Sequence, residues 1–480
     1  MKVKLNIGGR SMEAKANLSQ QEIKKAIQIM VLPIVIESIL QMTSGFCLTG
    51  MMGRLDATSI SAFSLSNRII NITWAILRGI TMGSAVFVAQ AYGSKNTKEI
   101  KQIIKQTILG LSILIFLIQQ FIFLNTEVVL SIFNPNNELM TIASKCLKTS
   151  SWSLYFMSIM LIITSSLQSM NRARISMQIV MSMNITSIII GYLFIFGNYN
   201  MPNLGVQGAA IGTFSGYFVA CFYGLYLMFN KKNGYIYFGE KIEKTKFSIV
   251  TFIKSLKPDI NQIKTIYRIG IPISLENSFW QLSTIILTRA ILNYGESTLA
   301  AYQLGLRAES ISFMPSNAFA IAATAFVGQC VGAKNEELGK KYMKELFKST
   351  IIITIITSIP LIFFPKQLML VLTNDIELIN IASKYLIVMG LIQLAGNLGG
   401  VINGALRGSG YTKLPMIISA IGIWGIRVPF TVLIVYFTRL DIQWVWVAMG
   451  FDVCIRWIIG YIIYKKKDLY NTRNNLVEVL

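Results

Sequence analysis

The sequence predicts an all-α protein that crosses a membrane many times, and three observations carry this prediction. Hydrophobic residues make up 53% of the 480 residues and charged residues only 14%, whereas soluble domains carry about 25% charged residues. The mean hydropathy is +0.56. Apolar runs recur along the chain, and since a helical crossing needs roughly 20 apolar residues, about twelve crossings would use half of it. The rest suffices for short loops but not for a large soluble domain.

The residue types argue against an enzyme. The chain has no His, the commonest metal ligand and a frequent general acid or base. Its five Cys residues are scattered without a CxxC pair, so we expect no disulfide framework and no zinc site. The Walker A pattern GxxxxGK[ST] is missing from the sequence, which argues against coupling to ATP. We therefore expect no catalytic residue, no resident metal and no cofactor.

We predict twelve spans, each an apolar run bounded by charged residues or by Asn, Pro and Gly. The first six cover residues 26–53, 59–91, 102–124, 139–170, 175–197 and 204–229. The second six cover 265–293, 298–331, 345–364, 378–406, 414–438 and 442–464. Ser19 and Glu22 have the spacing of a capping box just before the first span, which predicts a helix start there.

Basic residues set the orientation, because Lys and Arg are retained in short cytoplasmic loops. They cluster after the second, fourth, eighth, tenth and twelfth predicted spans, at Lys95–Lys105, Arg172 and Arg174, Lys334–Lys348, Arg407 and Lys413, and Lys465–Lys467. The loops between these clusters contain few cations. The first 25 residues are polar and lack the apolar core of a signal peptide. We expect a multi-pass protein of the plasma membrane, the inner membrane in a bacterium, with both termini cytoplasmic.

The chain divides into five predicted parts. A cytoplasmic segment (1–25) precedes an N-lobe of six spans (26–229), and a linker (230–264) leads to a C-lobe of six spans (265–464) and a cytoplasmic tail (465–480). The linker contains eight Lys residues interleaved with aromatic residues. Such a segment suits a nucleic-acid arm or a linker that faces anionic lipid. We favour the lipid-facing linker and expect the bilayer, not a nucleic acid, as partner.

An internal repeat relates the two lobes. Shifting the chain by 239 residues aligns Pro33 with Pro272 and Glu37 with Glu276, and it places AQAYGSKN at 89–96 on GQCVGAKN at 328–335. Each copy has an even number of spans, so both copies enter the membrane from the same side. Parallel repeats of this kind are related by an axis along the membrane normal. The fold class predicted is therefore two six-helix bundles with pseudo-two-fold symmetry.

Several motifs resemble one known family. They are the two QxxGxKN segments, FCLTGMMGRL at 46–55, NLGVQGAAIGT at 203–213, GIPISLENSFWQL at 270–282 and ALRGSGYTKLP at 405–415. Together they resemble the MATE (multidrug and toxic compound extrusion) family over nearly the whole chain. The resemblance implies an antiporter that exports organic, often cationic, drugs by alternating access in exchange for H⁺ or Na⁺. We expect a monomer that binds small organic cations.

The alternative function is a flippase for a lipid-linked oligosaccharide or another amphipathic substrate, which related multi-helix exporters perform. A flippase of this kind requires a cavity rich in cations to bind pyrophosphate. The predicted spans contain few cations, so export of organic compounds is the favoured interpretation.

Glu37 and Glu276 are the first candidates for ion coupling. An ionised side chain at the bilayer centre costs at least about 2.5 to 3.5 kcal/mol, which makes such residues functional candidates. Each Glu lies one turn after a proline, Pro33 or Pro272, and a proline frees a backbone carbonyl within a helix. Either Glu could bind a proton or a sodium ion, and the alternative role is a hydrogen bond across a helix interface.

The sequence departs from the family pattern at two positions. Many members read FVDT in the first span, with an Asp implicated in ion binding, and this chain has Leu48 in place of that Asp. In the seventh span several branches carry a Glu where this chain has Trp280, and Glu276 lies one turn earlier. One helical turn keeps both positions on roughly the same face, so Glu276 is a candidate substitute.

The remaining candidates are charged and polar residues of the spans. Asp452 is a third candidate for ion coupling, although its position four residues before Arg456 favours a structural salt bridge, with Arg427 as another available cation. Arg68 and Arg307 are equivalent in the repeat and are expected to anchor helices, because they would repel cationic drugs. Predicted substrate contacts are Gln41, Asn67, Asn277, Trp280, Gln281, Tyr302 and Gln303.

Overall fold

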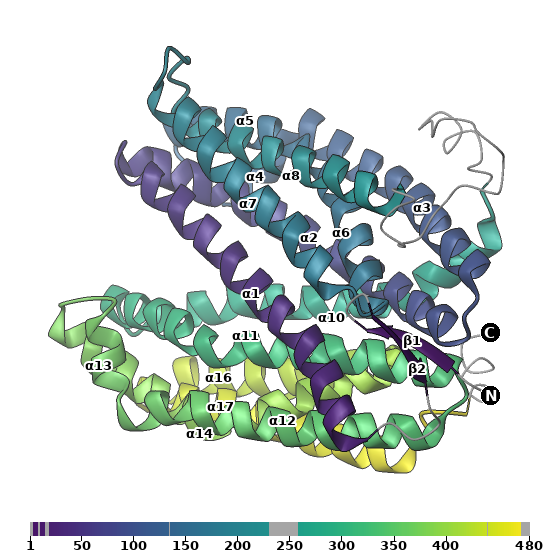
Figure 1. Cartoon of the computed structure of the whole chain (residues 1–480). Coiled ribbons are helices and arrows are strands. Elements are labelled where there is room, and N and C mark those ends of the chain that lie inside the picture. The colour runs from purple at the N-terminus through teal and green to yellow at the C-terminus, as the bar shows by residue number, and fades with distance from the viewer. Residues whose placement is uncertain are drawn as a thin grey trace. The chain divides into compact units, whose positions relative to one another are not determined.

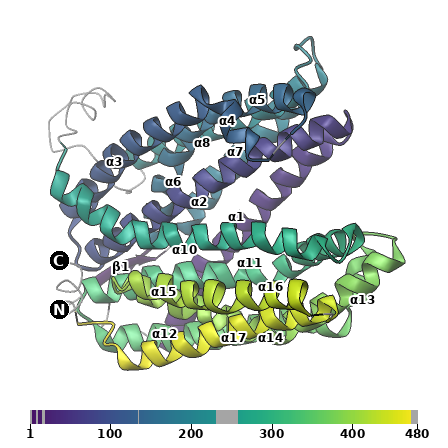
Figure 2. The same cartoon turned by 180° about the vertical axis from the view of Figure 1, so that it is seen from behind.

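The computed structural model describes residues 3–7, 10–14, 19–133, 135–229, 258–438 and 440–471 (Figure 1). Helices of the first half are α1 Gln20–Met52, α2 Ala57–Gly93, α3 Thr97–Leu124, α4 Thr126–Ser131, α5 Asn137–Ser151, α6 Ser153–Ser169, α7 Ala173–Phe196 and α8 Val206–Phe229. Those of the second half are α10 Ile260–Leu292, α11 Glu296–Gly332, α12 Glu336–Phe363, α13 Pro365–Leu370, α14 Ile376–Gly408, α15 Lys413–Gly422, α16 Val428–Phe437 and α17 Ile442–Lys466. A π-helix, η2 Ile423–Arg427, joins α15 to α16, and the three segments follow one line in Figure 2.

The described residues contain ten helices long and apolar enough to cross a membrane, or eleven if α5 and α6 count as one span bent by 43°. The remaining predicted span, the seventh (265–293), lies in α10, which has 33 residues but carries the polar side chains of Glu276, Asn277 and Gln281 in its middle. The predicted all-α, multi-pass membrane fold is therefore confirmed. The sequence did not anticipate the bend between α5 and α6, or the antiparallel hairpin β1 Val3–Ile7 and β2 Arg10–Ala14.

The N-terminal signal of the first helix works as predicted. The backbone N–H of Ser19 donates to Oε2 of Glu22 at 2.8 Å, and the backbone N–H of Glu22 donates to Oγ of Ser19 at 3.3 Å. These reciprocal bonds satisfy two N–H groups that have no acceptor within the helix. The capping box therefore starts α1 six residues before the apolar run that predicted the span.

The internal repeat is visible in the helix boundaries. The ends of α2, α3 and α4 recur 239 residues later as the ends of α11, α12 and α13. The short helices α4 and α13 were not predicted individually, yet they obey the same spacing. The start of α5 and the end of α6 likewise correspond to the start and the end of α14. The two copies of the sequence repeat therefore fold into helices in the same order and with matching boundaries.

The QxxGxKN segments form the same turn in both copies. Lys95 and Lys334 have positive φ angles of 61° and 53°, a left-handed conformation that stops a helix. Oδ1 of the following Asn96 accepts from the N–H of Glu99 at 3.2 Å, and Oδ1 of Asn335 accepts from the N–H of Leu338 at 3.0 Å. The Lys ends one long helix and the Asn caps the next, which explains the paired KN of the motif.

The chain forms two compact units. The N-terminal unit consists of Pro33–Gly270, and the C-terminal unit consists of Ile271–Leu480 together with Met1–Leu32. The boundaries fall inside α1 and α10, next to Pro33 and Pro272. Most of the predicted linker, residues 230–257, lies outside the described residues, and α10 begins at Ile260.

Glycines allow neighbouring helices within each unit to approach closely. A Cβ on Gly404 of α14 would collide with the backbone carbonyl oxygen of Ala320 on α11, and a Cβ on Gly408 would lie 2.5 Å from the carbonyl oxygen of Thr324. In the other unit, a Cβ on Gly212 of α8 would lie 2.6 Å from Cα of Gly191 on α7. Small residues at such crossings are the usual way in which membrane helices pack.

We expect Gly404→Ala to destabilise the C-terminal unit by about 1 to 3 kcal/mol, because the new methyl group overpacks the contact between α14 and α11. The matched control is Gly400→Ala on the same helix, where a Cβ would find its nearest atoms at 3.8 and 3.9 Å. Thermal unfolding in detergent should show a lower Tm for the first variant and an unchanged or slightly raised Tm for the second. Equal Tm values would contradict the close contact.

Candidate ion-coupling and substrate site

Glu37 is a buried carboxylate held by neutral donors. It lies on α1 one turn after Pro33, and 6% of its surface is exposed. Oγ of Ser176 donates to Oε2 of Glu37 at 2.9 Å, and Nε2 of Gln168 donates to the same oxygen at 3.2 Å. Within the described part of the chain no Lys or Arg forms an ion pair with Glu37, and Arg78 attracts it only from farther away. This carboxylate therefore lacks a counter-ion in direct contact.

Glu276 is equally buried but has a counter-ion. Its exposed fraction is 5%. Nη2 of Arg407 on α14 lies 2.7 Å from Oε2 of Glu276, and Oγ of Ser419 on α15 donates to Oε1 at 3.2 Å. Arg407 was noted in the sequence only as a cation of a cytoplasmic loop, whereas its side chain folds back against α10.

The two glutamates occupy equivalent positions of the repeat. Gln168 and Arg407 are 239 residues apart, as are Glu37 and Glu276, and a Ser of the following helix completes each site. Ser176 lies in the first turn of α7, whereas Ser419 lies near the end of α15. The two sites thus differ chiefly in one partner, a neutral amide in one unit and a guanidinium in the other. The replacement turns one of two equivalent carboxylates into half of an ion pair.

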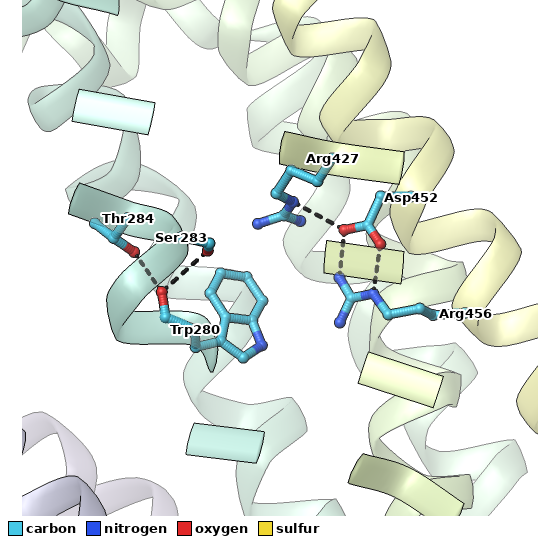
Figure 3. A network of polar contacts seen from close by, with 6 residues as sticks. All are labelled: Trp280, Ser283, Thr284, Arg427, Asp452 and Arg456. Atoms are coloured by element: carbon cyan, nitrogen blue, oxygen red, sulfur yellow. Dashed lines mark hydrogen bonds and ion pairs between the residues drawn. The ribbon is translucent and has the colours of Figure 1, made fainter. Parts of the chain in front are cut away.

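Asp452 lies at the centre of a second ion-pair network in the C-terminal unit (Figure 3). Its side chain is fully buried, and Nε and Nη2 of Arg456 approach its two carboxylate oxygens at 2.8 and 2.9 Å. Nε of Arg427 lies 2.8 Å from Oδ2 of the same carboxylate. A Cβ on Gly422 would collide with Oδ1, so a glycine lets α15 pass directly beside Asp452.

The π-helix η2 positions Arg427. Its wider turn is closed by the N–H of Val428, which donates to the carbonyl of Ile423 five residues earlier. Pro429 follows at once and has no N–H to donate. Single π turns are frequently found at functional sites, and here the turn ends on an arginine that is 3% exposed.

Trp280 borders this network. Its side chain is 41% exposed, and its ring centroid lies 4.6 Å from Cζ of Arg427 and 5.6 Å from Cζ of Arg456. The indole therefore lies against two guanidinium groups, as Figure 3 shows. Such contacts are favourable because a cation is attracted to the face of an aromatic ring.

Glu309 on α11 is a polar residue that was not among the candidates predicted from the sequence. Its carboxylate accepts hydrogen bonds from the hydroxyl of Tyr385 and, at 2.9 Å, from Nε2 of Gln393. The signal that could have found it is an acid within a predicted span, at position 309 of 298–331. Tyr302, a predicted substrate contact, is 3% exposed and stacks on Trp446 at a centroid distance of 5.3 Å, so it packs inside the unit.

The other predicted residues lie at more accessible positions. Gln41, Asn67, Asn277 and Gln281 are half-buried, and Gln303, Arg68 and Arg307 are exposed. Leu48, at the position of the family's Asp, is 6% exposed and belongs to an apolar core. A Cβ on Gly191 of α7 would lie 2.8 Å from Cδ2 of Leu48. A packing contact therefore stands where the family pattern has an acid.

No group of three or more His, Cys, Asp or Glu side chains within the described ranges could hold a metal ion. The polar groups of both units are instead arranged as isolated carboxylates, each with its own donors.

A family model with the description MatE matches residues 33–193 and 272–433, one segment in each copy of the repeat. The chain belongs to the MATE family. MATE proteins are transporters, which agrees with the expected lack of catalysis. The predicted family resemblance is thereby confirmed for both halves of the chain.

Relatives match over nearly the full length. The chain is 28% identical to "Probable multidrug resistance protein NorM" of Thermotoga maritima, over 91% of this chain and 90% of the relative. It is 23% identical to "Probable multidrug resistance protein YoeA" of Bacillus subtilis, over 94% and 96%.

Solved structures share the fold. A MATE P26A mutant superposes with a TM-score of 0.84 at 17% identity, over 94% of this chain and 97% of the other. A MOP superfamily transporter from Pyrococcus furiosus, whose description refers to a binding pocket of reverse polarity, gives a TM-score of 0.82 at 18% identity, over 92% and 95%. At 17 to 18% identity, these structural similarities establish only the fold of this MATE protein.

The two kinds of carboxylate should respond differently to neutralisation. Asp452→Asn leaves two arginines without a buried counter-ion and should destabilise the protein by about 3 to 5 kcal/mol. Glu37→Gln removes a charge that only neutral groups hold, so we expect a loss below about 1 kcal/mol. Thermal unfolding of both purified variants checks this difference, and a Glu37→Gln variant as unstable as Asp452→Asn would refute it.

Proposed function

We propose that this MATE protein exports organic drugs and toxic compounds across the plasma membrane in exchange for H⁺ or Na⁺, by alternating access. Family membership supports transport, and two relatives that match nearly the full length carry names of multidrug resistance proteins. The alternation of basic and cation-poor loops supports cytoplasmic termini. The proposed active form is a monomer, because each copy of the repeat contains its own buried carboxylate.

We assign ion coupling first to Glu37, and one observation carries this assignment: Glu37 is buried among neutral donors. A buried carboxylate without a counter-ion gains most from binding a cation, because burial disfavours its free charged form. A proton neutralises it directly. A sodium ion would find oxygen ligands in the carboxylate, in Oγ of Ser176 and in the amide oxygen of Gln168, and hard cations prefer oxygen.

Glu276 and Asp452 take secondary roles in this proposal. Arg407 already neutralises Glu276, and Arg427 and Arg456 already neutralise Asp452. Binding of another cation at either carboxylate would have to displace a guanidinium from a contact shorter than 3 Å. We therefore propose that these two carboxylates hold the helices of the C-terminal unit together.

Ion entry supplies the energy for export in this scheme. An outward-open state binds the ion and releases the substrate, and an inward-open state does the reverse. Each monovalent cation that enters releases about 2.3 kcal/mol per 100 mV of membrane potential. That energy supports a gradient of several tens-fold for a neutral substrate, since about 1.4 kcal/mol corresponds to a factor of ten.

The deciding experiment is drug transport by the full chain in proteoliposomes with a pH gradient or a sodium gradient imposed alone. Ethidium is the probe. We expect one gradient to drive uptake by the wild type, and Glu37→Gln to lower the driven rate at least about tenfold, because it removes the charge that binds the ion. Transport by Glu37→Gln at the wild-type rate would remove Glu37 from coupling.

The matched control is the double variant Glu276→Gln, Arg407→Gln. It removes both charges of the equivalent site together, so no buried charge is left unpaired. We expect this variant to retain gradient-driven transport within about threefold of the wild type, a change smaller than one hydrogen bond to a charged group. Loss of coupling in the double variant, with coupling kept in Glu37→Gln, would move the ion site to the C-terminal unit.

A further inference from the structure

We propose that the cluster of Trp280, Arg427, Arg456 and Asp452 binds the carboxylate of an aromatic substrate, so that the exporter prefers aromatic acids and zwitterions to simple organic cations. The proposal rests on the proposed export function and names the substrate class of that transporter. It departs from the small organic cations expected from the family resemblance.

The charges in the cluster do not balance locally. Two guanidinium groups share the single carboxylate of Asp452, both at 2.8 Å, which leaves one positive charge in excess. Two other acids have their direct partners elsewhere: Glu276 pairs with Arg407, and Glu309 accepts from Tyr385 and Gln393. Glu276 and Arg456 attract each other electrostatically but form no ion pair within 4 Å in the described part of the chain. Glu309 and Arg427 attract each other electrostatically but form no ion pair within 4 Å among the described residues.

Arg427 has hydrogen-bond donors to spare. It is 3% exposed, and its contact with Asp452 uses Nε. Nε lies within ion-pair distance of Asp452 but is a buried donor without a hydrogen-bond acceptor among the described residues. The two terminal nitrogens have no hydrogen bond to another described residue, and Figure 3 shows them on the side of Trp280. A buried donor without an acceptor is costly. The planar fork of a guanidinium matches a carboxylate with two parallel bonds, so a carboxylate is the ligand that satisfies it best.

Trp280 adds an aromatic surface to the same place. Because both guanidinium groups lie within 6 Å of its ring, a cationic ligand at the ring would meet two like charges. The 41% of Trp280 that remains exposed offers apolar area to the ring system of a ligand whose anionic group reaches Arg427. Aromatic pairs of this kind add stabilisation beyond the buried area. An aromatic ring with a carboxylate therefore fits both features, and a cation fits neither.

The test compares norfloxacin, which carries a carboxylate and an ammonium group, with its methyl ester, which keeps the rings and the ammonium but lacks the carboxylate. Equilibrium binding to the purified full chain is measured by calorimetry without any ion gradient. We expect norfloxacin to bind at least about tenfold more tightly, as the loss of hydrogen bonds to a charged group implies. Equal binding, or tighter binding of the ester, would overturn the proposal.

Arg427→Gln tests the assigned residue. It leaves Asp452 paired with Arg456, so no buried carboxylate loses its last partner. We expect this variant to bind norfloxacin about as weakly as the wild type binds the ester. Its affinity for the ester should equal that of the wild type. Trp280→Leu, which alters no charge, should weaken both ligands and keep their ratio. The control Arg307→Gln changes an exposed arginine and should keep the wild-type preference for norfloxacin.

If Arg427→Gln still binds norfloxacin more tightly than the ester, the carboxylate binds elsewhere and the proposal is overturned. If Trp280→Leu binds norfloxacin and the ester equally, Trp280 and not only Arg427 recognises the carboxylate, which overturns the assignment of the ring to Trp280 and of the carboxylate to Arg427. Because binding is measured without a gradient, these outcomes do not depend on ion coupling. A protein that binds norfloxacin selectively but transports no drug would refute the proposed export and not the binding site.

Discussion

The cost of a buried charge within membrane-spanning helices is the constraint on which the polar interior of this MATE protein depends. Lipid offers no water to a side chain, so every ionised group needs a partner inside the protein. In the C-terminal unit arginines supply the partners, at Glu276 and at Asp452. In the N-terminal unit Glu37 has only a hydroxyl and an amide. The first arrangement gives each carboxylate a cationic partner, and the second leaves the carboxylate of Glu37 among neutral partners.

Gene duplication explains how one fold contains both arrangements. The two copies share helix limits, turn conformations and a glutamate after a proline, so the geometry around each carboxylate is set by the same backbone. One side chain on the opposing helix, Gln168 or Arg407, then decides whether the carboxylate has a neutral partner or a counter-ion. Two equivalent positions of one repeated fold therefore differ in whether the buried carboxylate has a counter-ion.

The sequence predicted most of the fold because its signals are local. Apolar length, basic loops, the Ser19 cap and the 239-residue repeat need only neighbouring residues or self-comparison. The bend between α5 and α6 has no proline to announce it. The partners of the carboxylates come from distant helices, so Gln168 and Ser176 carried no signal, and Arg407 looked like a loop cation. Glu309 could have been found, since it is an acid within a predicted span.

The π-helix η2 also marks a difference between the two copies of the repeat. Helix α7 has 24 residues, whereas the equivalent span Lys413–Phe437 has 25. A π turn accommodates one added residue without shifting either flanking segment out of its packing, because the surplus is absorbed in a single wider turn. In an ordinary helix an added residue rotates every later side chain by about 100° around the axis. The equivalent stretch at 186–188 is Thr-Ser-Ile, without charge, so the wider turn and the buried arginine occur together in one copy of the repeat and both are missing from the described helix α7.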